Sequence, residues 1–364
     1  MTLAVTLRKA LEKRYGAAGY TSIRAEVDEL AAIGGGRAVA LDDALEMAAV
    51  GVSPLTTTDA ASVRTAIRGV RQSLNDPDSA LLLIGGDDVI PFWQVANPVQ
   101  DRVADSDPIV FTDNYYGATA ETLEEILAPS LAVGRLADAK GMSAADLTAL
   151  IGLARANRQG RPVRSGSGAV INQEWLDFSH RAGATLPEPV DWHQAPGYVL
   201  DGGNMRDSDR EALYFNLHGF SGVPEWKAYS DVRRDYIKAA SPDSFSAEFI
   251  SGTVIYAENC YGTEIMGRST GNCCALRILK EGAAIIGATG RAFGSHIAPD
   301  MFLEDADLLA RFFFESFFRD RLPLGKALHQ AKLAYLNDPG TPGSDPFKQK
   351  TLLQFTLLGD PEWN

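Results

Sequence analysis

The stretch ALYFNLHG, residues 212–219, is apolar until it reaches His218 and Gly219. A second stretch, TVIYAENCYG at residues 253–262, is apolar in its first half and then presents Cys260. Such short, unbroken apolar runs are typical of strands that are buried on both faces of a parallel sheet. Because ligands of open parallel sheets bind beyond the carboxyl ends of the strands, His218 and Cys260 are predicted to meet at one sheet edge.

Further strand and helix signals alternate along the chain around these two stretches. Short apolar runs predict strands at residues 80–84, 131–133, 169–172 and 283–287. Apolar residues spaced three and four apart, with capping residues, predict helices at residues 58–74, 143–154, 272–280, 304–319 and 323–336. Strand, helix and strand in succession is the unit of a parallel sheet, so the predicted class is α/β, with a mostly parallel sheet in three αβα layers.

The length and one polar segment predict two subdomains. The 364 residues exceed a typical single domain of roughly 100–200 residues. Residues 155–168 are rich in Arg, Gly and Ser and are predicted to form a linker. We therefore expect an N-terminal α/β subdomain at residues 1–155, whose first ~50 residues show no clear assignment, and a catalytic subdomain at residues 165–364.

The chain is acidic, with 47 Asp and Glu against 34 Lys and Arg and a net charge of -13. This charge disfavours nucleic acid as a partner, since phosphate backbones are bound by clustered Lys and Arg. No apolar run approaches the ~20 residues that span a bilayer, and the N-terminus lacks the pattern of a secretion signal. With only three cysteines, two of them adjacent, no disulfide framework is expected. We expect a cytoplasmic protein with no membrane span.

His218 and Cys260 are the residue types that thiol catalysis requires. A nearby imidazole takes the thiol proton, and Gly219 has no side chain, so its amide and that of Cys260 could bind an oxyanion together. Taken alone, each residue is more typical of a structural role, because free Cys is commonly a buried small hydrophobe. The two residues together favour catalysis, since the His precedes the Cys by on the order of 40 residues, similar to the ~50 of caspases.

Several further segments occur in a fixed order along the chain. They are LLLIGGDDVIP at 81–91, TDNYYG at 112–117, LAVGRL at 131–136, His218-Gly219 with Trp226 downstream, Cys260, residues 283–289 and LGDP at 358–361. From about residue 57 onward this order resembles the gingipain branch of the caspase-fold (clan CD) cysteine peptidases. The resemblance implies a caspase-like fold and a cysteine-type endopeptidase, with His218 as catalytic base and Cys260 as nucleophile.

The resemblance also assigns roles to residues around this dyad. It implies that Glu174, just after the strand at 169–172, holds the catalytic His, although a solvated strand-end Glu would have the same sequence context. Asp177 lies near the position of the acid that pairs with a basic side chain before the scissile bond, although a helix cap or surface Asp is the more common role for such a residue. A basic substrate residue, Arg or Lys, is therefore favoured.

The cleft wall is implied to follow the fourth strand of the catalytic part. Residues 289–294 occupy that place, with Phe293 as a lid on the pocket and Trp226 as a further substrate contact. Arg291 leaves an alternative open, because a guanidinium pointing into the pocket would select an acidic substrate residue as in caspases.

Two departures from gingipains bear on the setting of the activity. The chain shows no secretion signal or β-sandwich domain, and CHAT-type peptidases, which are intracellular and cleave a protein partner, fit better. An intracellular peptidase needs control, so an activating partner is expected to act on polar segments at residues 155–164 and 226–238. The rival hypothesis is a catalytically inactive interaction module of the same fold.

Metal and nucleotide sites are not predicted, and no cofactor is expected. Cys273 and Cys274 lack zinc-ligand spacing with any histidine, and the GGGR at residues 34–37 lacks the phosphate-loop order. The histidines outside the dyad are His180, His193, His296 and His329. Four carboxylates could hold a calcium ion but are more typical of a solvated loop, namely Asp101, Asp105, Asp107 and Asp113.

Overall fold

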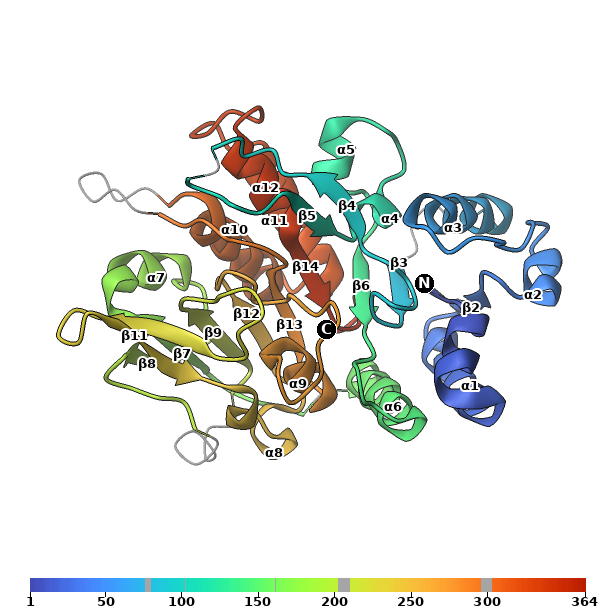
Figure 1. The fold of residues 1–364 in the computed structure, drawn as a ribbon, viewed down its shortest axis with the longest axis horizontal. Helices are drawn as coiled ribbons and strands as arrows, with labels where there is room; N and C mark the ends of the chain where they lie inside the picture. Colours follow the sequence, from blue (N-terminus) through green and yellow to red (C-terminus); the bar gives the residue numbers. More distant parts are fainter. Residues whose placement is uncertain (76–79, 102, 161, 202–209, 296–302) are drawn as a thin grey trace.

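A central ten-stranded sheet organises the computed structural model, which describes residues 1–75, 80–101, 103–160, 162–201, 210–295 and 303–364. Its strands, in spatial order, are β2 (Arg37–Ala40), β1 (Thr2–Thr6), β3 (Ala80–Ile84), β6 (Val133–Leu136), β14 (Phe355–Leu358), β13 (Ala284–Ala288), β12 (Val254–Ala257), β9 (Ala212–Asn216), β7 (Ser167–Asn172) and β8 (Val190–Ala195). Figure 1 shows this sheet running across the molecule.

The sheet consists of two parallel halves that run in opposite directions. β14 pairs in parallel with β6 and antiparallel with β13, so the change of direction falls between β14 and β13. All other neighbouring strands of the sheet pair in parallel. The predicted class, α/β with a mostly parallel sheet, is therefore confirmed.

Helices cover both faces, which explains why the strands are apolar throughout. They are α1 (Arg8–Ala32), α3 (Ala60–Leu74), α6 (Ala144–Gly160), α7 (Leu176–Ala182), α9 (Cys274–Lys280), α10 (Asp305–Phe314), α11 (Leu324–Leu336) and α12 (Pro346–Gln354). Alternate residues of β9 face opposite layers: Phe215 packs in the cluster that includes α6 and α9, whereas Tyr214 packs against Phe314 of α10. Burial on both faces is what continuous apolar strands require.

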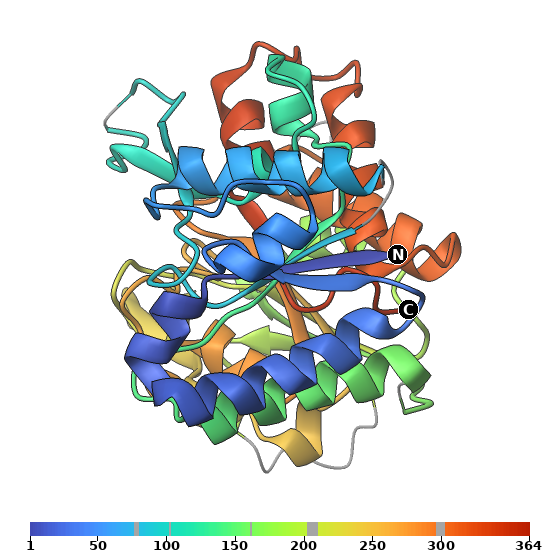
Figure 2. The same cartoon turned by 90° about the vertical axis from the view of Figure 1, so that its right-hand side faces the viewer.

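The first forty residues form a strand, a helix and a second strand that were not predicted from the sequence. β1 and β2 extend the sheet beyond β3, and α1 packs lengthwise along α6 (Figure 2). α1 is interrupted at Gly16, whose φ of 72° is non-helical, so its apolar residues do not keep one period. The strand predicted at residues 131–133 begins later, at Val133.

The predicted linker is mostly regular structure. Residues 155–160 complete α6, and residues 167–168 begin β7. Its polar side chains make tertiary contacts: Arg155 donates to Glu26 at 2.6 Å, and Arg158 donates to Asp360 at 2.6 Å. The division into residues 1–155 and 165–364 stays a prediction.

The two segments predicted to be control loops, residues 155–164 and 226–238, are in large part regular structure, while residue 161 lies outside the described residues. Residues 155–160 lie in α6, and residues 226–238 lie mainly in an antiparallel hairpin of β10 (Trp226–Ser230) and β11 (Asp235–Ala240). Their polar residues made them look like loops, but one face of each is packed against the protein. The expectation that an activating partner acts on these segments stays a prediction.

Candidate active site

β9 and β12 bring the two predicted catalytic residues to the same sheet edge. The strands are parallel neighbours, with Tyr214 opposite Tyr256, so the chain leaves both strands at one end (Figure 1). His218 and Cys260 follow these ends and border one cavity of about 440 Å³. The two loops are tied together, because the Leu217 amide donates to the side-chain oxygen of Asn259 at 2.9 Å.

The imidazole of His218 is fixed on several sides. Its backbone exchanges two hydrogen bonds with Lys227 at the start of β10, at 2.7 and 2.8 Å. Its ring lies between Trp175 and Tyr236, with centroid distances of 4.4 and 4.8 Å. Glu174 places Oε2 at 3.7 Å from Nε2, which is the orienting position that the sequence predicted for it. The carboxylate faces Nε2, so Nδ1 is the nitrogen left to exchange a proton.

The surroundings of His218 and Cys260 favour the neutral form of each side chain. Burial lowers the pKa of His218 from its ordinary value, although the carboxylate of Glu174 opposes the shift. Burial raises the pKa of the Cys260 thiol, which donates to the carbonyl oxygen of Ala292 at 3.4 Å. A neutral thiol beside a neutral imidazole suits general-base attack, in which the proton moves as the sulfur bonds to carbon.

The pH dependence of peptide hydrolysis should reflect this neutral pair. We expect kcat/KM to rise with pH through an apparent pKa below ~6.5, because His218 must lose its proton to act as base and its pKa is lowered. The rate should then stay level through neutral pH. Initial rates in buffers of constant ionic strength measure this profile, and an acid limb centred above pH 7 would contradict the assignment.

Gly219 is held against the backbone of the nucleophile. A Cβ at this position would lie 1.7 Å from the carbonyl oxygen of Cys260, so no other residue fits without moving one of the two loops. Within the described ranges, no acceptor is recorded for the amides of Gly219 and Cys260. Two backbone donors on loops in contact with each other, one of them the amide of Cys260 itself, have the composition of an oxyanion hole.

Two buried carboxylates, Glu258 and Asp307, form the inner wall of the same cavity and were not predicted. The hydroxyl of Tyr214 donates to Glu258 at 2.7 Å, and the amide of Ser295 donates to Asp307 at 2.6 Å. Burial raises the pKa of Glu258 well above its usual range, and burial also raises the pKa of Asp307. Burial and the neighbouring Asp307 therefore both favour the protonated form of Glu258.

The sequence carried a signal for one of these acids. Glu258 precedes Cys260 by two positions at the end of a strand, so a side chain near the nucleophile was to be expected there. Asp307 comes from the first turn of α10, and only the tertiary structure brings it to Glu258.

The other predicted substrate contacts divide into two groups. Arg291 and Phe293 border the cavity, and Phe293 packs against Phe347 with centroids 4.8 Å apart. Asp177 is exposed on α7 and does not border it. Trp226 is 4% exposed and packs in the core against Phe215, so it supports β10 and does not face the cavity.

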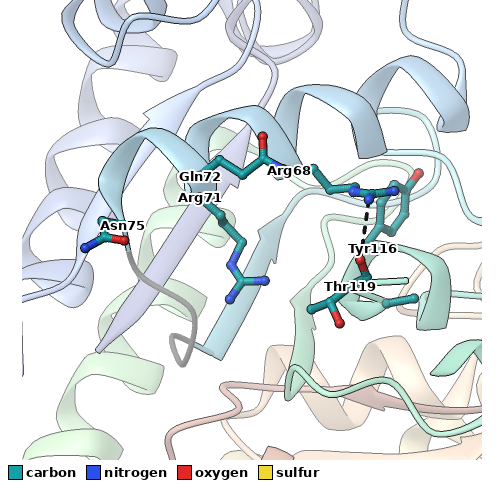
Figure 3. A pocket seen from close by; sticks show the side chains of 7 residues that line it. Arg68, Arg71, Gln72, Asn75, Tyr116 and Thr119 are labelled. Carbon is teal, nitrogen blue, oxygen red and sulfur yellow. Dashed lines mark hydrogen bonds between the residues drawn. The ribbon is translucent and has the colours of Figure 1, made fainter. Parts of the chain in front are cut away.

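A second pocket, of about 360 Å³, lies between α3 and residues 116–119 and contains neither member of the dyad. Arg68 and Arg71 extend from α3 on its upper side (Figure 3). Arg68 is engaged by Glu121 at 2.7 Å and donates to the carbonyl oxygen of Thr119. No cysteine or histidine lines this pocket among the described residues, whereas the cavity at Cys260 contains both.

Three of the four acidic residues considered for calcium have protein cations as partners, whereas Asp101 accepts from the backbone amides of Val103 and Ala104. Lys350 pairs with Asp105 and Asp107, and Arg135 pairs with Asp113. The described part of the chain contains no group of three or more metal-ligating side chains, while His296 lies outside it. In the same residues, no helix combines the length and hydropathy needed to cross a membrane.

Comparison with known proteins places this site in a class. Residues 205–364 match the model of peptidase family C25. The fold resembles the crystal structure of the Arg-specific cysteine proteinase gingipain R, with a TM-score of 0.65 and 11% identity over 100% of this chain and 77% of that one. It also resembles the complex of Porphyromonas gingivalis RgpB pro- and mature domains, with a TM-score of 0.66 and 12% identity over 100% of this chain and 79% of that one.

The search of curated proteins found no match. The fold is therefore the caspase-like fold of gingipain R, and the segment that matches the family model carries both His218 and Cys260. The resemblance inferred from the sequence motifs is confirmed.

Proposed function

We propose that the protein is a cysteine endopeptidase that uses His218 and Cys260 as its catalytic dyad. The observation that carries this proposal is the meeting of both residues at one cavity, on loops joined by the Leu217–Asn259 hydrogen bond. Its substrate is a protein or peptide, which is the substrate class of a peptidase family. A reducing, intracellular setting is part of the proposal, supported by three cysteines that are all free.

The reaction proceeds in two stages. Sγ of Cys260 bonds to the scissile carbonyl carbon while the thiol proton passes to His218, and the amides of Gly219 and Cys260 hold the oxyanion. The carbon–nitrogen bond then breaks, and His218 gives its proton to the leaving amine. Water, deprotonated by His218, next attacks the thioester and releases the carboxylic acid and the thiol.

Selective alkylation separates this proposal from the inactive interaction module. Cys260 is partly exposed, whereas Cys273 and Cys274 are 5% and 2% exposed. An electrophile built as a peptide should therefore label Cys260 in a reaction that depends on His218, and mass spectrometry locates the label. Labelling of Cys260 at the same rate in wild type and His218→Ala would favour the module.

We further propose a basic residue, Arg or Lys, before the scissile bond. Glu258 and Asp307 border the cavity, and a guanidinium or ammonium entering there would favour their ionised forms and pair with them. The similar structure of gingipain R is described as Arg-specific. Arg291 at the cavity's border is the source of the competing preference for an acidic residue.

Asp307→Asn should lower kcat/KM for a peptide with Arg before the scissile bond by about ten- to a hundred-fold, because it removes a charge-assisted bond. A matched Leu peptide should change little. Asp177→Ala is the control, since Asp177 lies outside the cavity and the ranking should stay unchanged. Hydrolysis of matched peptides with Arg, Lys, Asp, Leu or Ala measures the preference, and faster cleavage of the Asp peptide would assign selection to Arg291.

A further inference from the structure

An exposed aromatic surface lies beside His218, outside the cavity. Phe220 is 36% exposed and Tyr236 is 40% exposed. Tyr236 contacts His218 edge to face at 4.8 Å, Phe220 at 5.0 Å and Tyr229 at 5.3 Å. We call Phe220, Tyr229 and Tyr236 the aromatic ledge. Solvent-exposed clusters of large aromatic side chains commonly mark binding surfaces.

The ledge is held rigidly in place. Phe220 directly follows Gly219 on a turn that Glu264 fastens through the Ser221 hydroxyl at 2.6 Å and the Gly222 amide at 2.8 Å. The two tyrosines face each other across the β10–β11 hairpin, where Tyr229 is paired with Tyr236. Since β10 also pairs with the backbone of His218, the ledge and the imidazole keep a fixed relation.

The position of the aromatic ledge relative to His218 and Cys260 indicates which part of the substrate it contacts. Trp175 contacts His218 and borders the cavity, whereas Phe220 and Tyr236 do not border it. In the proposed reaction the side chain before the scissile bond enters the cavity, and His218 protonates the leaving nitrogen. That nitrogen belongs to the next substrate residue, so the chain after the scissile bond leaves past the side of His218 where the ledge lies.

We propose that the aromatic ledge binds an apolar, preferably aromatic, substrate side chain in the first two positions after the scissile bond. This inference rests on the proposed function, because it needs a leaving group at His218. The aromatic ledge selects substrate residues after the scissile bond, whereas the cavity at Glu258 and Asp307 selects the residue before it. It acts on acylation alone, since the leaving peptide has departed before water attacks the thioester.

The test compares substrates that are identical up to the scissile bond. One peptide continues with Phe, one continues with Ser, and a third substrate ends in a methyl ester, whose leaving group is too small to reach the ledge. Wild type should favour the Phe peptide over the Ser peptide. In Phe220→Ala, the ratio of kcat/KM for the Phe peptide to that for the methyl ester should fall about five- to ten-fold, and Phe220→Leu should recover part of it.

Val232→Ala is the matched control, because Val232 lies in the same hairpin, is 95% exposed and is not part of the ledge. Its ratio should equal that of wild type. Equal rates on the Phe and Ser peptides, or an equal loss on peptide and ester in Phe220→Ala, would overturn the ledge while leaving the dyad intact. A wild-type protein that cleaves none of the three substrates would instead overturn the proposed function, and the ledge with it.

Discussion

Cys260→Ala is expected to abolish peptide hydrolysis, with kcat falling by about 10⁴- to 10⁶-fold. The sulfur is the atom that bonds to the substrate, and an Ala methyl has no counterpart for it. The variant should fold normally, because it shortens a partly exposed side chain whose recorded hydrogen bond is a weak one, to Ala292. Steady-state hydrolysis of the preferred peptide measures the loss, and circular dichroism confirms the fold.

His218→Ala should cost nearly as much, and the double variant should add little, because the two side chains act as one unit. Cys274→Ala is the control: it removes a thiol from the buried face of α9 and should retain wild-type kcat. More than a few per cent of wild-type turnover in either dyad variant, with contaminating protease excluded, would show that the dyad is assigned incorrectly.

Gly219→Ala should lower kcat by about 10²- to 10³-fold, the usual cost of one lost oxyanion donor. The added methyl would lie 1.7 Å from the Cys260 carbonyl oxygen, so the Gly219 backbone and its amide have to shift. Gly271→Ala is a matched control, since the nearest atom to its added Cβ is the Ser269 hydroxyl at 4.0 Å. It should leave both kcat and thermal stability unchanged.

A second measurement separates the oxyanion hole from the dyad. Alkylation of Cys260 by iodoacetamide passes through no oxyanion, so Gly219→Ala should keep most of its labelling rate while losing turnover. If labelling and turnover fell together, the substitution would have displaced the nucleophile itself. If turnover stayed at the wild-type level, the assignment of the Gly219 amide would be wrong.

Some predictions from the sequence were wrong, because a local pattern does not reveal which parts of the folded protein a side chain contacts. Trp226 begins an alternating strand, and its side chain faces the core while its neighbour Lys227 pairs with the backbone of His218. Asp177 is close in sequence to Glu174, but the intervening helical turn directs it to solvent. The polar residues at 155–160 resembled a linker, although their partners, Glu26 and Asp360, lie far away along the chain.

Local sequence patterns were enough to predict the buried strands, and with them the strand ends that carry His218 and Cys260. Burial of a continuous apolar run depends on the run itself, and the residues that follow it are then placed by the sheet edge. The pairing of Glu258 with Asp307 and the ledge beside His218 were decided only by the tertiary structure. Such groups come from segments far apart along the chain, and their meeting depends on strand order and helix packing, which no local pattern encodes.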